Sequence, residues 1–283
     1  MMQSCPVDGQ SIAARERQSS VGAHFAVVDL VKTYLARAAG MGGVHALGPI
    51  SFDLKQSDFF AVVGPSGCGK STLLDLMAGL TTKTSGRILF EGHEVTGGVV
   101  PNGVGIVFQD DASFPWLNVY DNIAFGLRRM GMDAAEIRRR VDHALKLMGL
   151  TEFVHAYSAQ LSGGMRQRVC IARTLVLQPR MIFLDEPFGA LDQQTRLLMG
   201  DELLRLWRET GASVMLITHA LDEAAMLADR VGVMSARPGK FLDVISTGWP
   251  KSRTSEIILH PDFGAITARM WSTLRAESLK SMS

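Results

Sequence analysis

The chain of 283 residues carries 29 basic and 28 acidic side chains, a net charge of +1, and 47% of its residues are hydrophobic. This composition supplies apolar material for a compact core and excludes nucleic acid or an anionic membrane as a general electrostatic partner, because such partners select a basic surface. No apolar run approaches the length of a membrane span and residues 1–20 lack an export signal, so we expect a cytoplasmic protein. The three cysteines have no metal-ligand spacing, which indicates reduced thiols.

The N-terminal part of the chain predicts a tail followed by two strands. Residues 1–23 are polar and irregular, and we expect them to form a mobile tail. The segment 25–34 predicts a first strand, and a second is expected around 50–54 after a loop rich in glycine and alanine. These two strands are expected to form an antiparallel edge.

A buried strand over 59–63 leads into a glycine-rich turn and then a helix, which is the context of a phosphate-binding loop. The turn reads Gly64-Pro65-Ser66-Gly67-Cys68-Gly69-Lys70-Ser71-Thr72. Its glycines allow backbone N–H groups to curl around a polyphosphate, Lys70 supplies a positive charge, and the Ser71 hydroxyl can bind Mg²⁺. A structural Gly/Ser turn is the alternative, but the flanking strand and helix favour a nucleoside triphosphate site.

Cys68 lies in this turn just before the helix. The helix dipole favours a thiolate there, so we expect Cys68 to be the most readily alkylated thiol of the folded domain. The alternative is a small residue that is tolerated in a tight turn, because phosphate loops turn backbone rather than side chains toward the ligand.

The middle third of the chain predicts an inserted helical region. Short strands are expected at 86–90 and 104–108, the second ending at Gln109. A capping-box pattern at 133–136 and an apolar stripe from Ile137 to Met148 then predict a helix. We expect a helical subdomain over about 113–178, inserted between strands of the sheet.

The last third repeats a pattern of strands that end in polar residues. Ser162, Gly163 and Gly164 begin another predicted helix, which alone would most often be only a helix cap. The apolar strand 181–185 ends in two carboxylates, and the strand 213–217 leads to Thr218-His219. Carboxyl ends of strands are where α/β sheets bind ligands. From about residue 247 the chain is expected to be a polar, weakly helical tail.

Together these segments, over residues 25–245, resemble the ATP-binding subunit of an ABC transporter. The resemblance implies an α/β fold with a RecA-like P-loop NTPase core, an antiparallel β edge and an inserted helical subdomain, over residues 24–246. The roles it implies are as follows: Gly64 to Ser71 as the Walker A loop, Gln109 as the Q-loop glutamine, Leu161 to Gln167 as the signature, Met181 to Asp185 as the Walker B strand, Glu186 as the catalytic carboxylate, Ala190-Leu191-Asp192 as the D-loop, His219 as the switch histidine and Tyr34 as the aromatic that stacks on adenine.

A finer resemblance follows Gln109. The segment Phe114-Pro115-Trp116 is similar to that of importers for nitrate, sulfonates, taurine and related small anions, although a surface turn with a packed tryptophan is the alternative. Two departures from the family pattern, Ser57-Asp58 before the Walker A strand and Ala220 after His219, leave the γ-phosphate chemistry untouched. The loop 97–102 lacks the charged residues often seen there.

The resemblance also implies partners and a mechanism. Two copies pack head to tail with ATP between Walker A of one copy and Ser162, Gly163 and Gly164 of the other. Lys70 holds phosphates; Ser71, Gln109 and Asp185 bind Mg²⁺; Glu186 polarises water; His219 holds the γ-phosphate. The dimer would drive a membrane permease, and through it a solute-binding protein, from the cytoplasmic face of the inner membrane, with no role for nucleic acid.

Two other functions stay open from the sequence. A soluble ABC-type ATPase that acts as a mechanical clamp on DNA or the ribosome would share every motif, but such chains usually carry a coiled-coil insertion or two cassettes. A P-loop kinase explains the phosphate loop and leaves the signature and His219 without a role.

Overall fold

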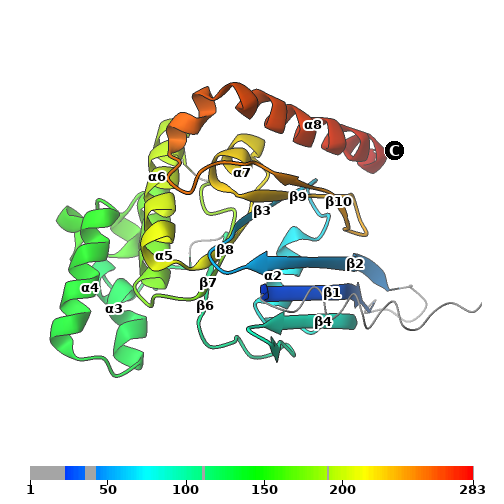
Figure 1. The fold of residues 1–283 in the computed structure, drawn as a ribbon. Coiled ribbons are helices and arrows are strands. Elements are labelled where there is room, and N and C mark those ends of the chain that lie inside the picture. Colours follow the sequence, from blue (N-terminus) through cyan, green and yellow to red (C-terminus); the bar gives the residue numbers. More distant parts are fainter. Residues whose placement is uncertain (1–22, 36–42, 110–111, 190, 283) are drawn as a thin grey trace, which may run out of the picture.

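The computed structural model describes residues 23–35, 43–109, 112–189 and 191–282 (Figure 1). The expected mobile tail therefore lies almost wholly outside the described residues. Within them, none of the helices combines the length and apolar character needed to cross a bilayer.

A six-stranded sheet forms the centre of the molecule. Its strands follow the order β10 (Phe241–Ser246), β9 (Arg230–Met234), β3 (Phe59–Val63), β8 (Ser213–Ile217), β7 (Met181–Asp185) and β6 (Val104–Val107). Neighbouring strands from β9 to β6 are parallel, and β10 is antiparallel to β9. This confirms the expected α/β core.

The inner strands β3, β7 and β8 are buried at every position because both faces of the sheet are covered there. Along β3, Phe59, Ala61 and Val63 join one buried cluster, which includes side chains of the helical region, α6, α7 and α8. Phe60 and Val62 point the other way, into a cluster with α2 and the antiparallel strands. The continuous apolar runs in the sequence thus reflect two cores that share one sheet.

The first two strands pair antiparallel as expected, and they form a sheet of their own. Its order is β2 (Val44–Lys55), β1 (Ala23–Tyr34), β4 (Ser85–Phe90) and β5 (His93–Glu94). Strand β2 also begins six residues before the predicted one at position 50. The Gly48-Pro49 pair in its middle hides the first half of the strand, since both residues usually interrupt strands.

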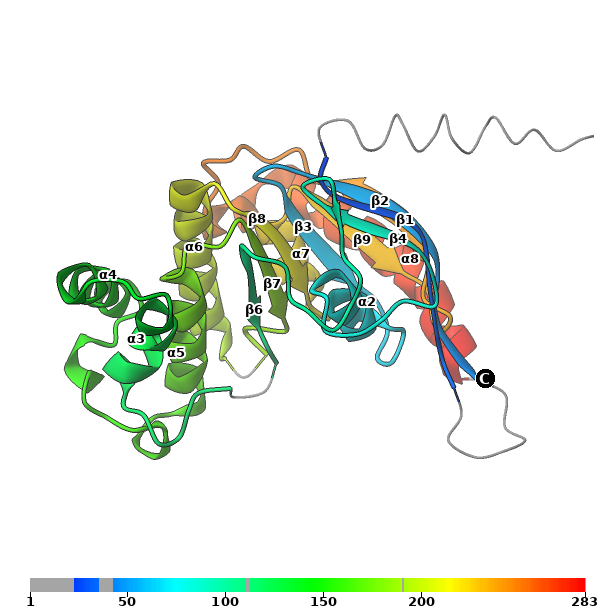
Figure 2. The same cartoon turned by 90° about the horizontal axis from the view of Figure 1, so that it is seen from below.

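The helical region projects from one side of the sheet (Figure 2). It contains α3 (Val119–Arg129), α4 (Ala134–Leu147), α5 (Gly163–Leu175) and the short 3₁₀ turns Thr151–Phe153 and Ser158–Gln160. Asp133 caps α4 by accepting from the backbone N–H groups of Ala135 and Glu136. The Glu136 carboxylate does not close the predicted capping box but binds the guanidinium groups of Arg139 and Arg140.

Three further helices flank the central sheet. Helix α2 (Lys70–Met77) follows β3, α6 (Gln193–Thr210) lies between β7 and β8 in the chain, and α7 (Leu221–Leu227) joins β8 to β9. Both ends of α6 are capped: the Asp192 side chain accepts from the backbone of Thr195, and Gly211 ends the helix in a left-handed conformation.

The C-terminal residues form a docked helix, where the sequence predicted a polar, weakly helical tail. After the 3₁₀ segment Ser255–Leu259, helix α8 (Pro261–Met282) crosses over α7 and contacts β9 and β10 (Figure 1). Phe263, Met270 and Leu274 are buried in the core cluster, and their spacing places them on one face. Polar residues surround these positions in the sequence and obscure the apolar face. The docking of this helix against the core was therefore not predicted.

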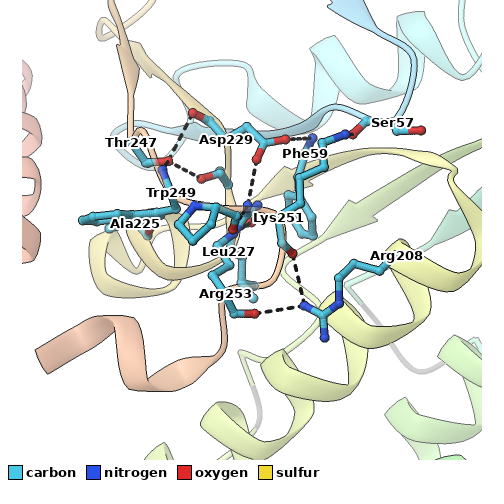
Figure 3. Close-up of polar contacts among 12 residues, drawn as sticks. Ser57, Phe59, Arg208, Ala225, Leu227, Asp229, Thr247, Trp249, Lys251 and Arg253 are labelled. Carbon is cyan, nitrogen blue, oxygen red and sulfur yellow. Dashed lines mark hydrogen bonds and ion pairs between the residues drawn. The ribbon is translucent and has the colours of Figure 1, made fainter. Parts of the chain in front are cut away.

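A buried arginine anchors the segment that precedes this helix (Figure 3). The fully buried Arg253 side chain donates to Asp229 Oδ1 at 2.8 Å and to the carbonyl of Leu227. The other oxygen of Asp229 accepts from the Phe59 backbone N–H at 2.9 Å. Burial lowers the pKa of Arg253, while Asp229 opposes this. One carboxylate therefore joins the C-terminal segment to the first residue of β3.

Neighbouring contacts extend this anchor to two helices (Figure 3). Arg208 of α6 donates to the Arg253 carbonyl at 2.9 Å, and the Trp249 indole donates to the Ala225 carbonyl of α7 at 2.7 Å. The Arg253 guanidinium also lies 4.9 Å from the centre of the Trp207 ring. These contacts join the segment around Arg253 to α6 and α7.

We expect Arg253→Ala to lower the free energy of unfolding by about 3 kcal/mol or more, because it leaves the partly buried Asp229 without its cation. The matched control is Arg269→Ala, which removes an exposed arginine paired with Asp243 and should cost less than about 1 kcal/mol. Denaturant unfolding of both variants measures the difference. Equal losses would mean that Arg253 contributes no more than a surface pair.

Candidate functional site

The phosphate loop connects β3 to α2 and turns its backbone toward an open cavity. Gly69 sits at the N-cap of α2 with φ 109°, a conformation that favours glycine. A Cβ atom there would lie 2.7 Å from Leu47 Cδ2, so the loop also packs too closely for a side chain. Since glycine offers no side-chain acceptor, the N–H groups of the first turn stay available for an anion.

The cavity has a volume of about 590 Å³. Its lining combines the phosphate loop with polar residues from other strand ends: Tyr34, Val44, Ala46, Ser66, Gly67, Gly69, Lys70, Ser71, Thr72, Gln109, Glu186, His219 and Arg237. The Lys70 ammonium group donates to the carbonyls of Gly64 at 2.9 Å and Pro65 at 3.0 Å. The sequence-predicted residues of this loop thus surround one space, with Gly64 and Pro65 behind the lysine.

Three residues from three strand ends meet at one carboxylate oxygen. Glu186 Oε2 accepts from the Gln109 amide at 3.1 Å and lies 3.2 Å from Nδ1 of His219. Glu186 itself has φ 46°, the left-handed region that non-glycine residues seldom adopt. Strained backbone of this kind is concentrated at functional sites. The sequence placed these residues in one site, and the structure brings them together.

Asp185, beside Glu186, fits a cation ligand. It is 9% exposed, and among the described residues no hydrogen-bond partner reaches its Oδ1. Burial raises the pKa of Asp185, and a hydrogen bond with Ser71 lowers it. A buried carboxylate oxygen without a partner, next to a hydroxyl at the start of α2, is a donor set that Mg²⁺ accepts. The residues present therefore fit the metal that the sequence predicted.

Tyr34 lies at the end of β1, at the rim of the cavity. Its side chain is 41% exposed, and the Lys32 ammonium group lies 4.6 Å from the centre of its ring. Val44 and Ala46 of β2 line the same side. An exposed aromatic face beside two apolar side chains offers a flat base a stacking surface.

Comparisons with known proteins bear on this geometry. The family model described as "ABC transporter" matches residues 47–189. The chain belongs to the ABC transporter family. A taurine import ATP-binding protein of Jannaschia sp. (strain CCS1) is 47% identical over 200 residues, covering 70% of this chain and 74% of the relative. A taurine import ATP-binding protein of Roseobacter denitrificans is 43% identical, covering 78% and 83%.

A solved structure agrees with the fold. The dimeric post-hydrolysis state of an ATP-binding cassette bound to ADP and Pi superposes with a TM-score of 0.70 and 28% identity, covering 80% of this chain and all of that one. The predicted P-loop NTPase fold of the ABC type is thereby confirmed. The protein is an ABC ATPase, which hydrolyses ATP in connection with transport.

The ABC signature lies away from the cavity of its own chain. Ser162 caps α5 by accepting from the Met165 backbone N–H at 3.3 Å. A Cβ atom on Gly164 would lie 2.7 Å from Leu191 Cδ2, so the end of that side chain would have to shift, whereas one on Gly163 would meet only Arg166 at 3.8 Å.

Asp192 of the predicted D-loop, like Ser162, caps a helix of its own chain. The Asp192 carboxylate accepts from the backbone and hydroxyl of Thr195, and these bonds lower its pKa. Within one chain Asp192 is thus a helix cap, and Ala190 lies outside the described residues. The signature and Asp192 stay predicted nucleotide contacts.

The expectation that Cys68 is a reactive thiol is contradicted by its surroundings. The side chain is 1% exposed, and burial raises the pKa of the thiol despite the nearby Lys70. Desolvation of the thiolate therefore outweighs the helix dipole. The alternative reading applies: Cys68 is a small side chain packed inside a tight turn, with only its backbone near the cavity.

Arg237 is a cavity residue that the sequence did not reveal. It lies in the turn between β9 and β10, far in sequence from every nucleotide motif, and its side chain reaches the phosphate loop. An arginine in a turn rich in proline and glycine carries no motif, so only the fold identifies it.

A second buried carboxylate lies near the switch histidine. Glu223 on α7 accepts from the Thr218 hydroxyl at 2.8 Å. Burial raises the pKa of Glu223 to about 7; the Thr218 hydrogen bond and Arg196 oppose the rise, and Glu186 adds to it. The residue that precedes His219 is thus held by a carboxyl group that titrates near neutral pH.

We expect Glu223→Gln to gain stability relative to the parent as pH rises. Because the folded pKa of Glu223 lies above its ordinary value of 4.5, the carboxyl group favours the folded state at low pH. This contribution is lost as pH rises through about 7. Glutamine cannot titrate and keeps an acceptor for Thr218. Midpoints of thermal unfolding for both proteins at pH 5 and pH 8 measure the change, and a constant difference would contradict it.

Proposed function

We propose that this chain powers a membrane importer for a small anion such as taurine, another sulfonate or nitrate. The catalytic part of this proposal rests on one observation. Oε2 of Glu186 contacts both Gln109 and His219, and all three residues line the phosphate-loop cavity. This oxygen lies on the residue that follows the buried Asp185. Such a carboxylate can polarise a water for attack on a γ-phosphate.

The other residues of the site bind the nucleotide and the metal and position the attacking water. Lys70 and the N–H groups of the loop bind the phosphates, and Tyr34 stacks on the adenine. Gln109 and His219 orient the Glu186 carboxylate and the attacking water, and His219 holds the γ-phosphate. Ser71, Asp185 and Gln109 would hold Mg²⁺, which supplies positive charge to the phosphate oxygens when bound.

The active unit in this proposal is a head-to-tail dimer. Ser162 and Gly163 are exposed at the start of α5, and Gly163 has open space around its Cα atom. An exposed helix N-terminus can bind an anion, here the γ-phosphate of ATP held by the other copy. The dimeric cassette with ADP and Pi supports this arrangement. Asp192 would contact the nucleotide region across the same interface.

A permease is the partner expected at the helical region. Trp116 is 69% exposed and stacks on Phe114, which also contacts Phe125. The Arg173 guanidinium lies 4.5 Å from the centre of the Phe114 ring. Exposed aromatic clusters beside polar residues suit protein contacts. The permease would hold the chain at the cytoplasmic face of the membrane and connect it with an external solute-binding protein.

The solute class rests on two observations. The relatives from Jannaschia and Roseobacter are taurine import ATP-binding proteins by name, and Trp116, which follows Pro115, belongs to the aromatic cluster. A clamp on DNA or the ribosome is disfavoured because these relatives serve import. A P-loop kinase leaves His219 unexplained. The test of the solute class is uptake of labelled taurine and nitrate by cells with and without the gene.

The first test concerns catalysis. Glu186→Gln should bind ATP nearly as well as the parent but hydrolyse it slower by about two to three orders of magnitude, because the amide cannot act as a base toward water. Gln109 can still contact the new side chain. The variant should accumulate as an ATP-bound dimer in size-exclusion chromatography. Turnover within a few-fold of the parent would remove Glu186 from this role.

The second test concerns the composite site. In a mixed dimer of one Lys70→Ala chain and one Ser162→Arg chain, one site carries both changes and the other carries neither. We expect one intact site, and therefore nucleotide binding at about half of the parental stoichiometry. Each homodimer is the control and should have two defective sites. Binding no better than in either homodimer would rule out the trans arrangement.

A further inference from the structure

Arg237 lines the phosphate-loop cavity and binds the loop itself. Its Nε and Nη2 atoms both donate to the Gly67 carbonyl, at 3.2 and 3.0 Å. Because a trans peptide points its C=O and N–H in opposite directions, a carbonyl held by Arg237 keeps the following N–H, that of Cys68, directed away from Arg237. That N–H donates to the Pro65 carbonyl at 3.4 Å, across the turn. The guanidinium thus fixes the orientation of one peptide of the phosphate cradle.

The turn that carries Arg237, Ser235–Lys240, is pressed against the same loop. A Cβ atom on Gly239 would lie 2.3 Å from the Cys68 carbonyl oxygen, so turn and loop are in direct backbone contact. Gly239 also donates to the Ala46 carbonyl at 3.0 Å, and its own carbonyl accepts from Gly48 at 2.9 Å. The turn is therefore joined to β2 as well as to the loop.

The other side of the turn is held by the C-terminal helix. Oε2 of Glu277, on α8, accepts from the Ala236 backbone N–H at 3.0 Å. Glu277 is 6% exposed, and it lines a cavity with Ser235, Arg237 and Lys240. A buried carboxylate that accepts from a backbone N–H is a strong, directional contact. A continuous series of contacts thus runs from α8 through Glu277, Ala236 and Arg237 to Gly67.

We propose that Arg237 is a positioning residue for the phosphate loop and that α8, through Glu277, sets its position. Nucleotide affinity then depends on the C-terminal helix, which contacts this turn through Glu277. The inference rests on the proposed nucleotide site. Loss of the contact disorders the cradle before binding, so it weakens affinity and leaves the chemical step at saturating ATP unchanged.

The test compares Arg237→Ala and Arg237→Lys with the parent. We expect both to raise the dissociation constant for Mg-ATP and the KM about tenfold, with kcat within twofold, because each lacks the two-pronged contact. If Arg237 acted only through its charge, Arg237→Lys would bind like the parent, and this outcome would overturn the positioning role. Since Arg237 is exposed, these substitutions leave the core intact.

The helix contribution is tested by Glu277→Ala, with Glu277→Gln as the conservative variant that keeps an acceptor for Ala236. The alanine variant should raise the dissociation constant several-fold and glutamine should restore it. In the Arg237→Ala background the effect of Glu277→Ala should vanish, because both changes break one series of contacts. Full additivity would overturn the link between α8 and the loop.

Two controls separate this inference from the proposed function. Arg269→Ala alters α8 at its exposed pair with Asp243 and should leave nucleotide affinity unchanged. Lys70→Ala should abolish Mg-ATP binding. If the parent itself failed to bind Mg-ATP, the proposed function would be wrong. If the parent bound it and Arg237→Ala bound equally well, only the positioning inference would be wrong.

Discussion

The parallel pairing of four strands is the constraint on which the site depends. Strands β3, β8, β7 and β6 run side by side, and Asp185 pairs in register with Ile217 of the neighbouring strand. The phosphate loop, Glu186, His219 and Gln109 come directly after these strand ends, so the hydrogen bonds of the sheet alone bring them to one edge. No long loop is needed to assemble them, and the covered faces of the sheet keep that edge fixed.

The sequence predicted the parts of the site that depend on local order. Strand ends at Val63, Asp185 and Ile217 can be read from apolar runs, and the phosphate loop, Glu186 and His219 follow them. The sequence could not show Arg237, because its contact with Gly67 joins segments 170 residues apart. It also misjudged Cys68, since the helix dipole is visible from sequence whereas desolvation depends on the neighbours that cover the thiol.

The prediction for the C-terminal segment was incomplete for a different reason. The apolar positions Phe263, Ile266, Met270 and Leu274 are spaced for one helical face, but polar residues surround them and lower the average hydropathy. What stabilises the segment is tertiary: a buried Arg253–Asp229 pair and an apolar face against the core. Such contacts are absent from any local window of sequence, and tertiary packing rather than propensity decides whether such helices form.

The burial of the central strands on both faces has a consequence for motion. Amide hydrogens of β3, β8 and β7 lie between paired strands and under two cores, so they can exchange with solvent only when the whole domain unfolds. Two residues beyond the end of β8, the His219 side chain is 64% exposed. Two residues thus separate the fully buried end of β8 at Ile217 from the exposed side chain of His219. The residues that follow the strand ends can therefore rearrange during catalysis while the strands of the sheet stay paired.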